Sequence, residues 1–148
     1  MIREATIDDI PDLIRMGIVM CQESPTFSRY KPDYKRQYAM FLDFITDDDG
    51  LVLIAEDATA MFVGHVDQML WFEDVVASEE LLFVMPEQRK TARGVRMVEM
   101  FEAWAREKGA NEVHVGIMVK HHVAETTRFY ERLGYEYRGT LFEKRLEG

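Results

Sequence analysis

The N-terminal third of the chain shows a short apolar–polar alternation, followed by two stretches in which apolar residues recur at helical spacing. Residues 2–5 predict a strand. The run from Thr6 to Asp9 is typical of a capping box and Pro11 suits a first turn, so a first helix is expected to reach about Met20. Asp33 is suited to cap a second helix, which the acidic run at residues 47–50 ends.

The middle of the chain changes to a period of two, which is typical of strands. Residues 51–56 and 60–71, separated by a turn at residues 57–59, predict a hairpin. Residues 72–78 are expected to connect it to a further strand at residues 80–85. That strand is apolar on both faces, as a central strand covered by helices on both sides would be.

The C-terminal part continues the alternation of helices and strands. Thr91 is expected to cap a third helix that Gly109 ends, and residues 113–119 alternate as a strand. A helix over residues 124–133 ends at Gly134, and residues 135–146 predict one or two final strands. The order β-α-α-β-β-β-α-β-α-β(-β) predicts one α/β (α+β) domain over residues 1–148, with a mixed sheet of six to seven strands and four flanking helices.

Composition restricts the class of protein. The chain has 148 residues, of which 47% are hydrophobic and 30% charged, which is ordinary for a globular domain. Its apolar runs are too short to span a bilayer, and its first residues do not resemble a signal peptide. With Cys21 as the sole cysteine, an internal disulfide is excluded. We therefore expect a soluble cytoplasmic protein without a membrane partner.

Charge is divided unevenly along the chain. The net charge is −9, and residues 1–80 contain 17 acidic and 6 basic residues, whereas residues 81–148 contain 10 acidic and 12 basic residues. The acidic half would repel nucleic acid and attract cations, and the more basic half could bind an anion.

The junction between the strand at residues 80–85 and the third helix has the features of a phosphate-binding turn. The first amides of a helix lack intrahelical partners, and the helix dipole favours negative charge beside them. Arg89, Lys90 and Arg93 surround this turn, and Gly94 lets a ligand approach the backbone. The segment is not a P-loop, because the G-x-x-x-x-G-K-[ST] pattern is absent.

The sequence of this turn, Arg89-Lys90-Thr91-Ala92-Arg93-Gly94, resembles the Arg/Gln-x-x-Gly-x-Gly/Ala signature of the GNAT N-acetyltransferase superfamily. A second segment, Phe129-Tyr130-Glu131-Arg132-Leu133-Gly134-Tyr135, resembles the family's later helix with its aromatic–Tyr pair followed by Gly. The turn is also similar to that of phage-encoded members. Two positions depart from the family pattern: Ala92 replaces the first Gly, and Val123 replaces an Asn. If position 92 requires a positive φ, Ala92 would be strained and cofactor binding weakened.

The resemblance implies a splayed sheet and direct transfer of acetyl from acetyl-CoA to a primary amine. It places the cofactor along the central strand and the turn that follows, with free main-chain groups of Phe83 and Val84 beside the pantetheine arm and the Val84 amide as the donor to the thioester oxygen. The cofactor-binding residues that it implies are Phe83, Val84, Gln88, Arg89, Lys90, Thr91, Ala92, Arg93, Gly94 and Val95.

The same resemblance suggests two catalytic residues. Glu80, at the start of the central strand, is the candidate base, with Asp67 and His65 on the preceding strand as runners-up. Tyr130 is the candidate acid, because a phenol keeps its proton at neutral pH and could give it to the departing thiolate. Each residue also has a non-catalytic interpretation: Glu80 could be a solvated charge at the end of a strand, and Tyr130 could be an aromatic ring packed at the edge of the core.

Several other readings stay open at this point. His114, His121 and His122 lack metal-ligand spacing, so no metal site is expected.

The acidic half favours a cationic acceptor, either a small amine or a protein lysine or N-terminus. A catalytically inactive CoA-binding or protein-interaction module on the same fold is the main alternative function. An unrelated nucleotide-binding domain is disfavoured by the missing glycine fingerprint. The oligomeric state is open, and a homodimer is one option.

Overall fold

The computed structural model describes residues 1–117 and 121–146. Its helices alternate with strands in the predicted order up to the last helix. The α-helices are α1 (Ile10–Glu23), α2 (Tyr34–Thr46), α3 (Arg93–Glu107) and α4 (Val123–Arg132), and the short 3-10 helices are η1 (Ile7–Asp9), η2 (Phe27–Arg29) and η3 (Pro86–Gln88). The strands are β1 (Ile2–Glu4), β2 (Gly50–Ala55), β3 (Ala60–Gln68), β4 (Val75–Val84) and β5 (Glu112–His114).

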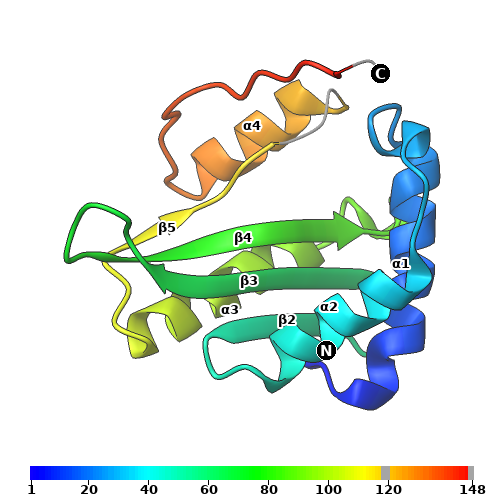
Figure 1. The fold of residues 1–148 in the computed structure, drawn as a ribbon, viewed down its shortest axis with the longest axis horizontal. Coiled ribbons are helices and arrows are strands. Elements are labelled where there is room, and N and C mark those ends of the chain that lie inside the picture. The colour runs from blue at the N-terminus through cyan, green and yellow to red at the C-terminus, as the bar shows by residue number, and fades with distance from the viewer. Residues whose placement is uncertain (118–120, 147–148) are drawn as a thin grey trace.

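The five strands form one mixed sheet in the order β1-β2-β3-β4-β5. Strands β1 to β4 pair antiparallel, and β5 pairs parallel with β4. That last pairing extends only from Val76–Glu112 to Ser78–His114, after which β5 diverges from β4 towards α4 (Figure 1). Among the described residues, the second half of β4 therefore has a strand partner on its β3 side alone. The expected mixed, splayed sheet is confirmed.

Local sequence signals set the ends of the helices as expected. The Thr6 amide donates to the Asp9 carboxylate at 2.8 Å, and this capping box precedes α1. The Asp33 carboxylate accepts from the Arg36 amide at 3.1 Å and caps α2. Helix α4 is followed by Gly134 at φ +91, a left-handed conformation that favours glycine.

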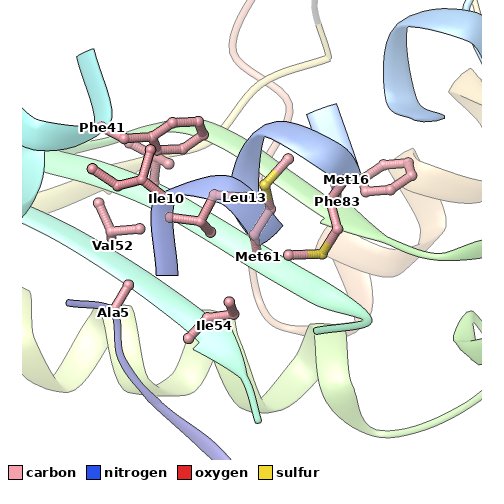
Figure 2. Packing of buried hydrophobic residues seen from close by; sticks show 10 residues of the cluster. Ala5, Ile10, Leu13, Met16, Phe41, Val52, Ile54, Met61 and Phe83 are labelled. Atoms are coloured by element: carbon pink, nitrogen blue, oxygen red, sulfur yellow. The ribbon is translucent and has the colours of Figure 1, made fainter. Parts of the chain in front are cut away.

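Helices cover both faces of the sheet and bury two hydrophobic clusters (Figure 1). The first cluster joins α1 and α2 to one face, and Figure 2 shows Ile10, Leu13 and Met16 of α1 pointing at the strands. The second joins α3 to the other face, where the rings of Phe62 and Phe101 lie 4.6 Å apart. Burial of these apolar faces fixes the position of β4 and of the turn that leads into α3. Within residues 1–117 and 121–146, no helix is long and apolar enough to cross a bilayer.

The predicted number of strands was wrong, because the described sheet has five strands and not six or seven. Residues 135–146, expected to form one or two strands, contain no regular secondary structure. Two of their side chains make contacts with other elements: Arg138 lies 2.6 Å from His114, the last residue of β5, and Glu143 pairs with Arg29 of η2 at 2.6 Å. The segment therefore touches the end of β5 through a side chain and forms no strand beside it. Strand β5 covers Glu112–His114, whereas the prediction was 113–119, of which residues 118 and 119 lie outside the described residues.

The hairpin before the site also differs in its strand boundaries. Strand β3 ends at Gln68 and β4 begins at Val75, so residues predicted as a connection belong to the sheet. The reason is visible in the pairing of Val75 with Gln68 and in the complete burial of Ala77 against the α3 cluster. Strand β4 consequently spans ten residues and carries both acidic residues of the Glu79-Glu80 pair in its middle.

Two glycines allow a matched test of this packing. A Cβ on Gly64 of β3 would lie 2.5 Å from Phe101 Cε1, so Gly64→Ala is expected to lower the free energy of unfolding by about 1–3 kcal/mol. A Cβ on Gly17 of α1 meets no atom within 4 Å, so Gly17→Ala is expected to raise it by roughly 0.5–1 kcal/mol. Urea denaturation measures both effects. Equal stability of Gly64→Ala and the wild type would contradict the described packing of α3.

Candidate active site

A cavity of about 740 Å³ opens where β5 leaves β4. It is lined by the second half of β4, the turn before α3, the inner side of α4 and the C-terminal end of α1. In Figure 1, α4 and β4 flank this region and the end of α1 adjoins it. The residues predicted from the sequence that line the cavity are Glu80, Phe83, Val84, Arg89, Lys90, Thr91, Gly94 and Tyr130.

The other four predicted residues, Gln88, Ala92, Arg93 and Val95, do not line the cavity but belong to the turn and the first residues of α3. Arg93 Nη1 donates to Gln88 Oε1 at 2.9 Å, and its Nη2 pairs with Asp57 Oδ2 at 2.6 Å. Ala92 has φ −79, which is outside the left-handed region. An alanine can adopt this conformation without backbone strain. Strain at position 92 is therefore no reason to expect weaker cofactor binding.

The N-terminus of α3 presents free amides beside the cavity. Within the part of the chain that the structure describes, the amides of Gly94 and Val95 have no hydrogen-bond acceptor, as expected at the first turn of a helix. Thr91 was predicted to cap this helix, but its hydroxyl donates to the Gln88 carbonyl at 2.6 Å and lies 3.5 Å from the Arg93 amide, a long distance for a capping hydrogen bond. The amides and the helix dipole make this end suited to an anion.

The basic side chains of the turn are partly occupied by acidic partners. Arg89 Nη2 pairs with Glu23 Oε1 of α1 at 2.5 Å, and its Nε donates to the Val84 carbonyl at 3.0 Å. Arg93 is held by Asp57, as described above. Lys90 is exposed and has no ion pair among the described residues. An anion at the turn would thus bind chiefly to the helix amides and Lys90. Arg89 could bind it only while also paired with Glu23.

The antiparallel ladder decides which main-chain groups of β4 face the cavity. The Met85 amide donates to the Thr59 carbonyl at 2.8 Å, and Val84 is paired with Ala60. Because hydrogen-bonded and non-hydrogen-bonded pairs alternate, the main-chain groups of Val84 and Leu82 point away from β3. The Val84 amide therefore points to the side of β4 that β5 leaves. The expectation of free main-chain groups at Phe83 was wrong, because Phe83 is paired with Met61 and its main-chain groups face β3. Its side chain is buried beside Met16 of α1 (Figure 2).

Glu80 lies on a β-bulge. Val63 pairs with Leu81 and Gly64 with Glu79, so Glu80 is the extra residue of β4. Its Oε1 lies 3.1 Å from Nδ1 of His65, whose ring contacts Phe44 of α2. The Glu80 side chain is 48% exposed, so the carboxylate borders the cavity while remaining open to water. Because successive side chains of a strand point to opposite faces of the sheet, the adjacent carboxylates of Glu79 and Glu80 have different neighbours.

Glu79, which the sequence analysis did not nominate, contacts Tyr130. The Tyr130 hydroxyl of α4 donates a hydrogen bond to Glu79 Oε2, and both residues line the cavity. Burial raises the pKa of the Glu79 carboxyl to about 7, and the charge of Glu80 adds to this rise. Burial, followed by the charge of Glu79, raises the pKa of the Tyr130 phenol well above its usual value. Tyr130 therefore keeps its proton throughout the neutral pH range.

The other candidate base Asp67 and the sole cysteine, Cys21, are not part of this pair. Asp67 is exposed near the end of β3, where its carboxylate accepts from the Gln68 amide, and it does not line the cavity. Cys21 on α1 is half-buried, and burial raises the pKa of its thiol, which makes it a weaker nucleophile. Among the residues described, no three His, Cys, Asp or Glu side chains converge as metal ligands would.

Known structures share this fold at low sequence identity. A transcriptional regulator from Bacillus halodurans C-125 aligns with a TM-score of 0.81 at 17% identity, a putative acetyltransferase from Agrobacterium tumefaciens with 0.77 at 19%, and an aminoglycoside 6'-N-acetyltransferase from Acinetobacter haemolyticus with 0.74 at 14%. Each alignment covers 99% of both chains. At these identities the likeness shows the fold alone.

Comparison by sequence gives two further results. A search of curated proteins found no match. The model of the acetyltransferase (GNAT) family matches residues 18–135, a range that includes the turn before α3, the cavity-lining half of β4 and all of α4. Because the match spans well over half of the chain, the protein belongs to the GNAT acetyltransferase family.

Proposed function

We propose that residues 1–148 act as one acyltransferase domain that transfers the acetyl group of acetyl-CoA to a primary amine without a covalent enzyme intermediate. The observation that carries this proposal is the meeting of three groups at one cavity: the free amides at the start of α3, the outward main chain of β4 and the Tyr130 hydroxyl. Transfer from acetyl-CoA needs groups that bind its diphosphate, orient its thioester and protonate the departing thiolate.

The diphosphate of acetyl-CoA would lie against the Gly94 and Val95 amides, with Lys90 beside it. The pantetheine arm would follow the edge of β4 that β5 leaves free, bonding to the main chain of Leu82 and Val84 as an added strand would. The thioester oxygen would accept from the Val84 amide, a donor fixed in place before the reaction.

The reaction would then need one base and one acid. The neutral amine attacks the carbonyl carbon, the C–N bond forms, and the proton lost by nitrogen passes to Glu80, directly or through water. The C–S bond breaks as the Tyr130 hydroxyl protonates the departing sulfur. Glu80 suits the first task because its exposed carboxylate can return that proton to solvent.

We propose further that the acceptor is cationic. The lining of the cavity includes the carboxyl groups of Glu23, Glu79, Glu80 and Glu125, of which Glu23 pairs with Arg89. Residues 1–80, which form α1, α2 and most of the sheet, contain 17 acidic and 6 basic residues. A structural neighbour named as an aminoglycoside acetyltransferase is consistent with a polycationic acceptor for this chain too.

The cationic acceptor predicts a dependence on salt. Raising ionic strength from about 10 mM to about 150 mM shortens the screening length from roughly 30 Å to roughly 8 Å. The Michaelis constant of a diamine is therefore expected to rise a few-fold, and that of an amino alcohol of equal length to rise less, since it carries one charge fewer. Steady-state release of CoA thiol measures both. A best acceptor that is neutral or anionic would contradict the cationic proposal and leave acetyl transfer standing.

A further inference from the structure

The contact between Glu79 and Tyr130 joins two titratable groups that are both withdrawn from water. Tyr130 comes from α4 and Glu79 from β4. The hydrogen bond between them links these two elements, both of which line the cavity. Among the described residues, Glu79 has no cationic partner within ion-pair distance, and its neighbour Glu80 is acidic. Burying a carboxyl group there costs free energy unless the group is protonated or hydrogen-bonded. The hydrogen bond from Tyr130 therefore stabilises Glu79 in this position.

The direction of this hydrogen bond depends on the proton of Glu79. An ionised Glu79 can only accept, so it holds the Tyr130 proton towards β4 and away from the cavity. A protonated Glu79 can donate to the Tyr130 oxygen, and the hydroxyl proton of Tyr130 is then free to point at a group in the cavity. The same pair therefore has two arrangements, and only the second offers a proton to the leaving thiolate.

We infer that Glu79 is a positioning residue for Tyr130: in its protonated form it turns the hydroxyl proton towards the departing thiolate and then replaces that proton. This inference rests on the proposed acetyl transfer. Sulfur takes the Tyr130 proton as the C–S bond breaks, the phenolate oxygen takes the Glu79 proton, and Glu79 is left as a carboxylate. Glu79 regains a proton from solvent after the CoA thiol has left, so no proton or electron is unaccounted for.

In the described part of the chain, three titratable or charged groups face the Glu79 carboxyl group. They are Glu80 on β4, Tyr130 on α4 and, following α4, Tyr135, whose hydroxyl donates to Glu102 of α3 at 2.9 Å. Burial and Glu80 both favour protonated Glu79, and only the hydrogen bond from Tyr130 opposes them. With the pKa of Glu79 raised to about 7, the chemical step should slow as pH rises through neutrality, because the ionised form captures the hydroxyl proton.

The test compares Glu79→Gln and Glu79→Leu by single-turnover acetyl transfer at saturating acetyl-CoA and amine. The amide of Gln donates to the Tyr130 oxygen but supplies no proton, so the rate should fall roughly tenfold and lose its decline above neutral pH. Leu provides neither function, and the rate should fall by about 10²-fold or more, near the lower end of the range for loss of a general acid. The dissociation constant of acetyl-CoA should change less than about threefold in both variants. Thermal melts verify folding, and Glu99→Gln, an exposed change on α3, serves as the control.

A double variant separates a shared step from independent effects. In a Tyr130→Phe background, Glu79→Gln should lower the rate by less than about twofold, because residues that act as one unit are not additive. Two outcomes overturn the inference alone: a folded Glu79→Gln protein with at least half the wild-type rate and an unchanged pH profile, or full additivity with Tyr130→Phe. A wild-type protein that transfers acetyl to no amine overturns the proposed function, and the inference with it.

Discussion

Replacing Tyr130 by Phe is expected to lower turnover by about 10²–10⁴-fold, the usual range for loss of a general acid. The substitution removes one hydroxyl and keeps the ring that packs against Phe129 and Tyr135. Acetyl-CoA affinity should change much less, because the hydroxyl would contribute chiefly in the transition state. Steady-state kinetics together with calorimetric binding of acetyl-CoA separate the two quantities.

Tyr135→Phe provides the matched control. Tyr135 lies five positions later and donates its hydroxyl to Glu102, but it does not line the cavity. Its loss is expected to leave turnover within about twofold of the wild type, since no step of general acid catalysis involves it. If Tyr130→Phe retained more than half of wild-type turnover, or lost activity only in proportion to a lowered melting temperature, Tyr130 would be a structural residue.

Gly94→Asp is expected to remove measurable binding of acetyl-CoA, a loss of at least about 100-fold, or about 2.7 kcal/mol. Gly94 is the second residue of α3, and its amide has no acceptor among the described residues. A carboxylate there would take the place of the diphosphate at the helix N-terminus and repel it. Isothermal titration calorimetry of acetyl-CoA with the wild type and the variant measures the difference.

Gly94→Ala distinguishes charge from bulk at the same position. A Cβ on Gly94 would lie 3.4 Å from Phe129 Cε1, an ordinary contact, so alanine is expected to retain binding within several-fold of the wild type. Equal binding by Gly94→Asp and the wild type would place the diphosphate elsewhere. Loss of binding in both variants would indicate that Phe129 cannot accommodate any side chain at position 94.

Most of the fold could be predicted from the sequence, because its elements are amphipathic and carry local stop signals. Capping by Thr6 and Asp33 and termination at Gly134 depend on neighbours within a few residues, and each is confirmed. The failures concern long-range pairing. Residues 135–146 alternate as a strand would, yet whether they join the sheet depends on partners such as Arg29 and His114, which are distant in sequence.

The candidate site was predicted in outline, and its details were not. The turn and Tyr130 belong to contiguous motifs, so the sequence indicated them directly. The ion pairs of Arg89 with Glu23 and of Arg93 with Asp57 join segments far apart in the chain, and no local pattern indicates them. Adjacent carboxylates on a strand point to opposite faces, which implies that one of the Glu79-Glu80 pair differs in its surroundings. Only the hydrogen bond between Glu79 and Tyr130 of α4, which joins positions 51 residues apart, shows which of the two meets Tyr130.

Acetyl transfer itself is tested most directly by incubating the protein with carbon-13-labelled acetyl-CoA and a panel of primary amines, followed by mass spectrometry. The panel would contain diamines, aminoglycosides, and peptides with free lysines or N-termini. We expect a labelled amide on at least one cationic amine, formed with an equal amount of CoA thiol and strongly reduced with Tyr130→Phe. If the protein bound acetyl-CoA but formed no labelled amide on any amine, in the panel or in cell lysate, the proposed acetyltransferase activity would be contradicted. The protein would then be a CoA-binding module.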